Sequence, residues 1–98
     1  MKTFSQLKRD LQKGVKIRTI LNNLKPEFNG EIRTIKTVQT NAVSFECVRN
    51  GRETESWLWW GKAANYEYEG NIFKVYDNPM EHNNFKRELL FEYEIMEA

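Results

Sequence analysis

The dipeptide Asn50-Gly51 constrains the fold of this chain more than any other feature of its sequence. Both residues tolerate the positive φ angles of a type I′ turn, so the flanking segments are expected to form a two-residue β-hairpin. The turn also fixes the register, because residues of the two strands pair by counting outward from it. This count predicts the pairs Arg49–Arg52, Cys47–Thr54, Glu46–Glu55, Phe45–Ser56, Ser44–Trp57, Val43–Leu58 and Ala42–Trp59.

The predicted register separates an apolar face of the hairpin from an aromatic one. Directly opposed residues share a face. Trp57 and Trp59 therefore point away from the apolar set, which comprises Val43, Phe45, Cys47 and Leu58. The same register sets Glu46 against Glu55, a mildly unfavourable pair of like charges. We expect either a slip of the register or a basic residue close enough to relieve this pair.

Further short strands are indicated on both sides of this hairpin. Apolar and polar residues alternate at 15–19 and 89–95, the pattern of half-buried strands. Segment 31–39 is also β-rich, but its large apolar residues are spaced by three, which predicts a β-bulge. Segments 22–30 and 77–86 predict loops, and Leu24 and Phe28 are expected to cover one end of the core. Gly70-Asn71 predicts a second hairpin with the pairs Tyr68–Phe73, Glu67–Lys74 and Tyr66–Val75.

The segment before these strands predicts a short helix, from about residue 4 to residue 12. Thr3 and Gln6 have the spacing of a capping box. Phe4, Leu7 and Leu11 form one apolar stripe, and a glycine two residues after the predicted end suits helix termination. The expected fold is α+β and mostly β: an N-terminal helix followed by about six short antiparallel strands, as a small bent sheet or an SH3-like barrel.

Length and composition indicate a single domain, 1–98, without disulfide staples. Thirteen per cent of the residues are aromatic, enough to build one core, and Cys47 is the only cysteine. No secretory signal and no apolar run of about 18 residues is seen, so we expect a cytoplasmic protein that does not contact the membrane. The net charge of +1 hides an asymmetry, since residues 1–40 sum to +6 and residues 41–98 to −5.

Catalytic and metal-binding patterns are not found in the sequence. His82, the only histidine, has no partner at ligand spacing, and Cys47 falls on the apolar face of a strand, where it is expected to serve the core. Glu92 and Glu94 share the outer face of one strand, but a chain of this size rarely forms the deep cleft that paired catalytic carboxylates need. We expect no enzymatic activity, no cofactor and no metal.

The cluster of Trp57, Trp59 and Trp60 is the main anomaly, because three indoles on one strand cannot all face one core. Two interpretations are open. The helix stripe covers Trp57 and Trp59 as a second small core, or these two indoles form an exposed patch, which is costly unless it binds something.

Four basic residues on predicted strands suggest another use of the same patch: Lys16, Arg18, Arg33 and Lys36. Aromatic platforms flanked by Lys and Arg bind single-stranded nucleic acid by stacking and charge neutralisation. The chain's pI of about 7.8 is low for such a protein.

Three short segments carry a resemblance to a known group: Thr3-Phe4 with Leu7-Lys8, then 38–42, then 56–63 with its tryptophans. Together they resemble small proteins of Gram-positive bacteria and of their phages and mobile elements. That group carries no known activity or binding residues, and Gly61 stands where its pattern has proline. The resemblance implies a bacterial cytosolic setting.

The sequence thus predicts a small binding module that contacts a protein, or a second copy of itself, through Trp57 and Trp59. The alternative is a single-stranded nucleic-acid-binding protein that uses the basic residues of its N-terminal half. A second alternative is a small ribonuclease-like toxin, for which the sequence offers no acid–base pair in a basic groove.

Overall fold

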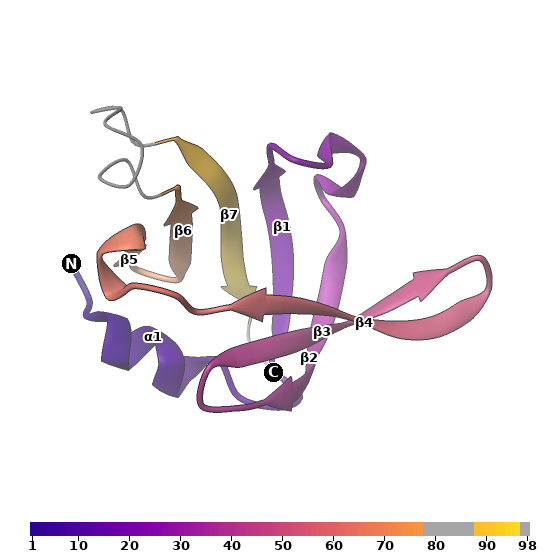
Figure 1. The fold of residues 1–98 in the computed structure, drawn as a ribbon, viewed down its shortest axis with the longest axis horizontal. Coiled ribbons are helices and arrows are strands. Elements are labelled where there is room, and N and C mark those ends of the chain that lie inside the picture. The colour runs from indigo at the N-terminus through magenta and orange to yellow at the C-terminus, as the bar shows by residue number, and fades with distance from the viewer. Residues whose placement is uncertain (78–87, 97–98) are drawn as a thin grey trace.

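The fold is one N-terminal helix and seven antiparallel strands, seen in a computed structural model that describes residues 1–77 and 88–96. Figure 1 shows the helix below the sheet and the β3–β4 hairpin projecting from the body. The elements are α1 (Phe4–Asp10), β1 (Lys16–Asn22), η1 (Pro26–Phe28), β2 (Ile32–Val38), β3 (Ala42–Arg49), β4 (Arg52–Trp59), η2 (Ala63–Asn65), β5 (Tyr66–Glu69), β6 (Ile72–Tyr76) and β7 (Leu89–Met96).

The strands form a single open sheet in the order β4-β3-β2-β1-β7-β6-β5. The predicted mostly-β architecture is confirmed, with one strand more than expected. The two end strands, β4 and β5, do not pair with each other, so the sheet stays unclosed and the SH3-like barrel is not confirmed. Strands β3 and β4 run across the direction of β1 and β7 in Figure 1, so the sheet bends strongly.

Both hairpin registers are as the turn residues predict. Asn50 and Gly51 have φ angles of 53° and 75°, and every pair counted outward from them occurs, including Glu46 with Glu55. The hairpin at Gly70 pairs Tyr68 with Phe73 and Tyr66 with Val75. The register between β2 and β3 shifts after Ile35, which confirms the predicted bulge.

The helix also begins as predicted. The backbone N–H of Gln6 donates to the Thr3 hydroxyl group (3.2 Å), and the Gln6 side chain accepts from the Thr3 backbone N–H (2.8 Å), which completes the capping box. The helix ends at Asp10, two residues earlier than expected. Leu7 and Leu11 are fully buried.

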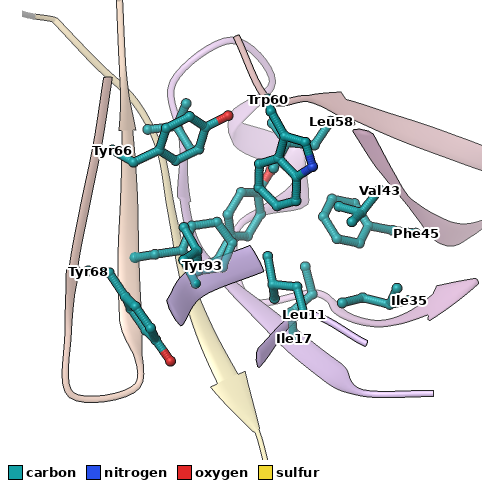
Figure 2. Packing of buried hydrophobic residues seen from close by; sticks show 13 residues of the cluster. Leu11, Ile17, Ile35, Val43, Phe45, Leu58, Trp60, Tyr66, Tyr68 and Tyr93 are labelled. Carbon is teal, nitrogen blue, oxygen red and sulfur yellow. The ribbon is translucent and has the colours of Figure 1, made fainter. Parts of the chain in front are cut away.

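One hydrophobic cluster connects the helix with all seven strands (Figure 2). Its buried members are Leu7, Leu11, Ile17, Ile35, Val43, Phe45, Leu58, Trp60, Tyr66, Tyr68, Phe73, Val75 and Tyr93. Cys47 is a buried free thiol, in line with its predicted place on the apolar face. The prediction for Leu24 was wrong: the residue is 65% exposed and lies outside the buried cluster.

Strand β1 is longer than its sequence pattern indicates, and the reason is tertiary. It runs to Asn22 because β7 continues alongside it, pairing Asn22 with Phe91 across a register shift. Most of the predicted loop at 77–86, including His82, lies outside the described residues. Among residues 1–77 and 88–96 the structure contains no helix of the length and apolar character that a bilayer crossing requires.

Candidate functional site

Trp57 and Trp59 form an exposed pair on β4, named here the indole pair. They lie two residues apart on one strand and share the face opposite Leu58. Their rings stack with centroids 6.0 Å apart and planes at 24°. Trp57 is 39% exposed and Trp59 is 64% exposed, whereas Leu58 between them is buried. The strand alternation therefore places two large aromatic rings in contact with solvent.

The helix does not cover the indole pair, which decides between the two interpretations of the tryptophan cluster. Phe4 of α1 contacts Trp60 instead, edge to face, with ring centroids 5.6 Å apart. Trp60 is 5% exposed and also contacts Tyr66. Trp60 lies two residues after the buried Leu58, so strand alternation turns it toward the core and separates this indole from the two exposed ones.

Carboxylates continue the face of the indole pair toward the hairpin tip. Because alternate residues of a strand share a face, Glu53, Glu55, Trp57 and Trp59 form one line of side chains, named here the indole row. Glu46 of β3 lies directly opposite Glu55. Glu46 and Glu53 are exposed. The face that carries the indoles is thus acidic on its outer half.

The like-charge pair of Glu46 and Glu55 persists without a slip of the register. The predicted basic neighbour is Lys36 of β2, whose Nζ lies 3.7 Å from Oε1 of Glu55. Glu46 makes no ion pair among the described residues. One cation therefore neutralises one of three carboxylates on this face.

The structure divides the four predicted basic residues between two faces of the sheet. Lys16 and Arg18 share one face of β1, and the β1–β2 register puts Lys36 of β2 on that same outer face. Arg18 pairs with Glu94 across β1 and β7, with Nε 3.0 Å from Oε1. Arg33 faces the opposite way, beside Ile17. The four do not form one basic surface.

Arg33 is buried, which the sequence did not predict. Its side chain is 8% exposed and forms an ion pair with Glu31, with Nε 3.2 Å from Oε1. The guanidinium group also lies 4.6 Å from the centroid of the Phe28 ring. Burial of this cation is offset by the ion pair and by the aromatic face beneath it.

Trp57 and Arg33 meet at one hollow of about 170 Å³, named here the aromatic hollow. It lies between the segment before and within η1, the β4 edge and β7. No lining residue is acidic. Its walls are formed by Asn22, Leu24, Lys25, Phe28, Arg33, Phe45, Ser56, Trp57, Leu58, Phe91 and Tyr93.

Tyr93 lines the aromatic hollow with a buried side chain. It is 7% exposed, and its hydroxyl group has no hydrogen-bond partner within the described part of the chain. Burial raises the pKa of Tyr93 to about 12, although the charge of Arg33 acts to lower it.

Sequence reasoning missed the hollow, because its residues come from segments more than 60 positions apart.

Other groups considered for chemistry do not assemble into a site. Glu92 and Glu94 share a face as expected, but Glu94 is engaged by Arg18. Within residues 1–77 and 88–96, no cluster of three or more His, Cys, Asp or Glu side chains is placed to hold a metal ion.

The fold and this surface define a small open antiparallel β-sheet protein with an N-terminal helix, an exposed indole pair and an aromatic hollow beside it. In comparisons with known proteins, the chain matches no family model, no curated protein and no solved structure.

Proposed function

We propose that this chain is a small protein-binding module whose contact surface is centred on the indole pair. The observation that carries the proposal is the exposure of two adjacent stacked indoles, 39% and 64% exposed. Tryptophan is enriched among the residues that supply most binding energy at interfaces, and adjacent exposed apolar rings are costly for a protein that binds nothing.

The pairing of the two edge strands also favours a contact surface at the indole pair. The edge at β5 is occupied by the N-terminus: the Lys2 backbone N–H donates to the Tyr68 carbonyl oxygen (2.8 Å), and the Lys2 ammonium group donates to the Gly70 carbonyl oxygen (2.7 Å). Strand β4, at the other edge, pairs with β3 and with no other strand of the described residues. An unpaired edge strand is a template for contact with another chain.

The partner is a second protein or a second copy of this chain, and the setting is the bacterial cytosol that the resemblance implies. Self-association is tested first, by sedimentation velocity over a range of concentrations. The double variant Trp57→Ala/Trp59→Ala is then compared with wild type. We expect it to lose self-association, or capture of a purified partner, while it keeps its near-UV circular dichroism.

The matched control is Ile32→Ala, which removes another exposed apolar side chain, 53% exposed, from β2. Binding by the control should equal that of wild type. If the double variant unfolds, the two indoles belong to the core and the proposal fails. Unchanged binding by a folded double variant also refutes it.

Single-stranded nucleic acid is a second candidate ligand, favoured by the aromatic hollow. Trp57 lines the hollow beside Arg33 and Lys25, and no carboxylate does. Aromatic rings with nearby cations stack bases and neutralise phosphates. Against this, Arg18, Arg33 and Lys36 are each within 4 Å of a carboxylate oxygen.

A fluorescence titration with mixed single-stranded oligonucleotides separates the two candidates. Nucleic-acid binding predicts saturable quenching that weakens steeply with salt, because each neutralised phosphate releases counterions. Quenching should also weaken in Lys25→Gln. No quenching at low salt would eliminate this candidate. The third prediction of the sequence, a small ribonuclease, is favoured by no structural observation.

A further inference from the structure

We infer that the indole row, with Glu46 beside it, binds an extended basic segment of the partner protein, one that carries Arg or Lys at alternate positions. This inference rests on the proposed function and names the chemistry of the partner. It combines the aromatic faces, the uncompensated charge and the spacing of these side chains.

The aromatic faces of the indole pair have no cation among the described residues. The structure contains cation–π contacts over Tyr68, Phe4 and Phe28, but none over Trp57 or Trp59. Tryptophan has the face that attracts cations most strongly. The two exposed tryptophan rings of the described chain are therefore available to a cation from another molecule.

The carboxylates beside the indole pair favour a positively charged ligand. Glu46, Glu53 and Glu55 lie on the same face, and among the described residues only Lys36 forms an ion pair with any of them, 3.7 Å from Glu55. Directly opposed like charges such as Glu46 and Glu55 destabilise a hairpin. A guanidinium or ammonium group from a partner relieves this repulsion, whereas a phosphate group adds to it. The surface therefore favours a basic polypeptide over a nucleic acid.

The spacing of the indole row fits an extended chain. Alternate residues of a strand are about 6.8 Å apart, so the row from Glu53 to Trp59 covers about 20 Å. A partner segment in extended conformation presents its own alternate side chains at the same interval. Arginine is the better match, because its planar guanidinium group both stacks on indole and pairs with carboxylate.

The experiment is a titration followed by tryptophan fluorescence, with the intact chain and three synthetic peptides of equal length as probes. One alternates arginine with serine, one lysine with serine and one glutamate with serine. We expect saturable quenching with the arginine peptide, weaker quenching with the lysine peptide and none with the glutamate peptide. The affinity should fall by about tenfold when salt is raised from about 20 mM to about 200 mM.

Three variants locate the contact. We expect Glu46→Gln/Glu53→Gln/Glu55→Gln to bind the arginine peptide about tenfold more weakly than wild type. Trp57→Ala/Trp59→Ala should lose the interaction as measured by isothermal calorimetry, which does not depend on the indoles. The matched control, Glu69→Gln, removes an exposed carboxylate from β5 and should bind like wild type.

The outcomes distinguish this inference from the proposed function. If the arginine peptide fails to bind, or binds the triple Gln variant as well as wild type, the basic partner is refuted. The indole pair is then judged separately, by the self-association and capture experiments. If the glutamate peptide or an oligonucleotide binds instead, the charge argument is wrong. Loss of every contact in Trp57→Ala/Trp59→Ala but not in the triple variant keeps the proposed function and rejects the inference.

Discussion

The hydroxyl group of Tyr68 donates a 2.6 Å hydrogen bond to Oδ2 of Asp10, across 58 positions of the sequence. This bond ties the last residue of α1 to β5. Lys2 continues the connection, since its ammonium group lies 4.8 Å from the centroid of the Tyr68 ring. The N-terminal segment is therefore held against one edge of the sheet by a polar contact as well as by the apolar stripe of the helix.

Removal of this hydrogen bond should loosen the helix. We expect Tyr68→Phe to lower the free energy of unfolding by about 1.5–3 kcal/mol, because a hydrogen bond to a charged acceptor contributes about that much. Urea denaturation measures the change. Asp10→Asn serves as the second arm of a double-mutant cycle, and additive effects of the two substitutions would contradict a direct interaction.

Alkaline pH should destabilise the fold through its buried tyrosines. Burial, followed by the hydrogen bond and charge of Asp10, raises the pKa of Tyr68 from 10.0 to about 12, and burial raises that of Tyr93 equally. Burial and then the proximity of Tyr93 raise the pKa of Tyr66 further. The folded chain holds these protons more tightly than the unfolded chain does. The contribution of these tyrosines to the free energy of unfolding is therefore fully present below about pH 10 and is lost as pH rises toward 12.

The tyrosine prediction is checked by absorbance at the tyrosinate band during a pH titration, together with urea unfolding at several pH values. Tyr68→Phe and Tyr93→Phe should each remove one late-ionising group from the titration. Ionisation of all tyrosines near pH 10 in the folded chain would contradict it.

The three tryptophans should differ in how much they stabilise the fold and in the wavelength of their fluorescence emission. Trp60 is 5% exposed, and its indole N–H has no hydrogen-bond partner among the described residues. We expect Trp60→Ala to cost about 3–5 kcal/mol, the range for truncation of a buried large ring. Trp59→Ala should cost no more than about 1 kcal/mol, from loss of the stacking contact with Trp57.

Fluorescence emission provides the independent measurement. Trp57→Phe/Trp59→Phe retains only the buried indole and should emit at shorter wavelength than wild type. Trp60→Phe retains only the exposed pair and should emit at longer wavelength. Equal emission maxima for the two variants would contradict the placement of the three rings.

Reversal of one charge in the hairpin should stabilise it. Glu46→Lys replaces the repulsion across the hairpin with an attraction to Glu55, and cross-strand pairs contribute about 0.2–1 kcal/mol. We expect a rise in the melting temperature of about 2–5 °C for a chain of this size. Glu69→Lys is the control and should change it little. A lower melting temperature for Glu46→Lys would show that the like-charge pair is not a liability.

The sequence alone predicted the two hairpins down to the partner of each residue, because a two-residue turn determines register by local geometry. The turn at Asn50 correctly placed Trp57 and Trp59 opposite Leu58, and a cation near the Glu46–Glu55 pair was one of the two outcomes expected. It did not identify Lys36 as that cation. That pairing depends on how β2 lies against β3, which no local signal determines.

The candidate site was predicted only in part, for the same reason. Trp57 and Trp59 follow from strand alternation, and both are exposed. Arg33 looks like any basic strand residue, yet it is buried, because Phe28 of η1, in the connection between β1 and β2, lies against its guanidinium group. The aromatic hollow combines such residues with Tyr93, and its existence follows from pairing between distant strands.

By itself, the sequence determined the capped helix, the hairpins and the alternation that splits the indoles from the apolar face, since each of these depends on hydrogen bonds and side-chain directions within a few residues. The tertiary structure decided that β1 pairs with β7, that the sheet stays open and that α1 packs on Trp60 instead of the indole pair. These outcomes depend on the total apolar surface that residues far apart in the chain bury together. That total is determined only when all strands are in place.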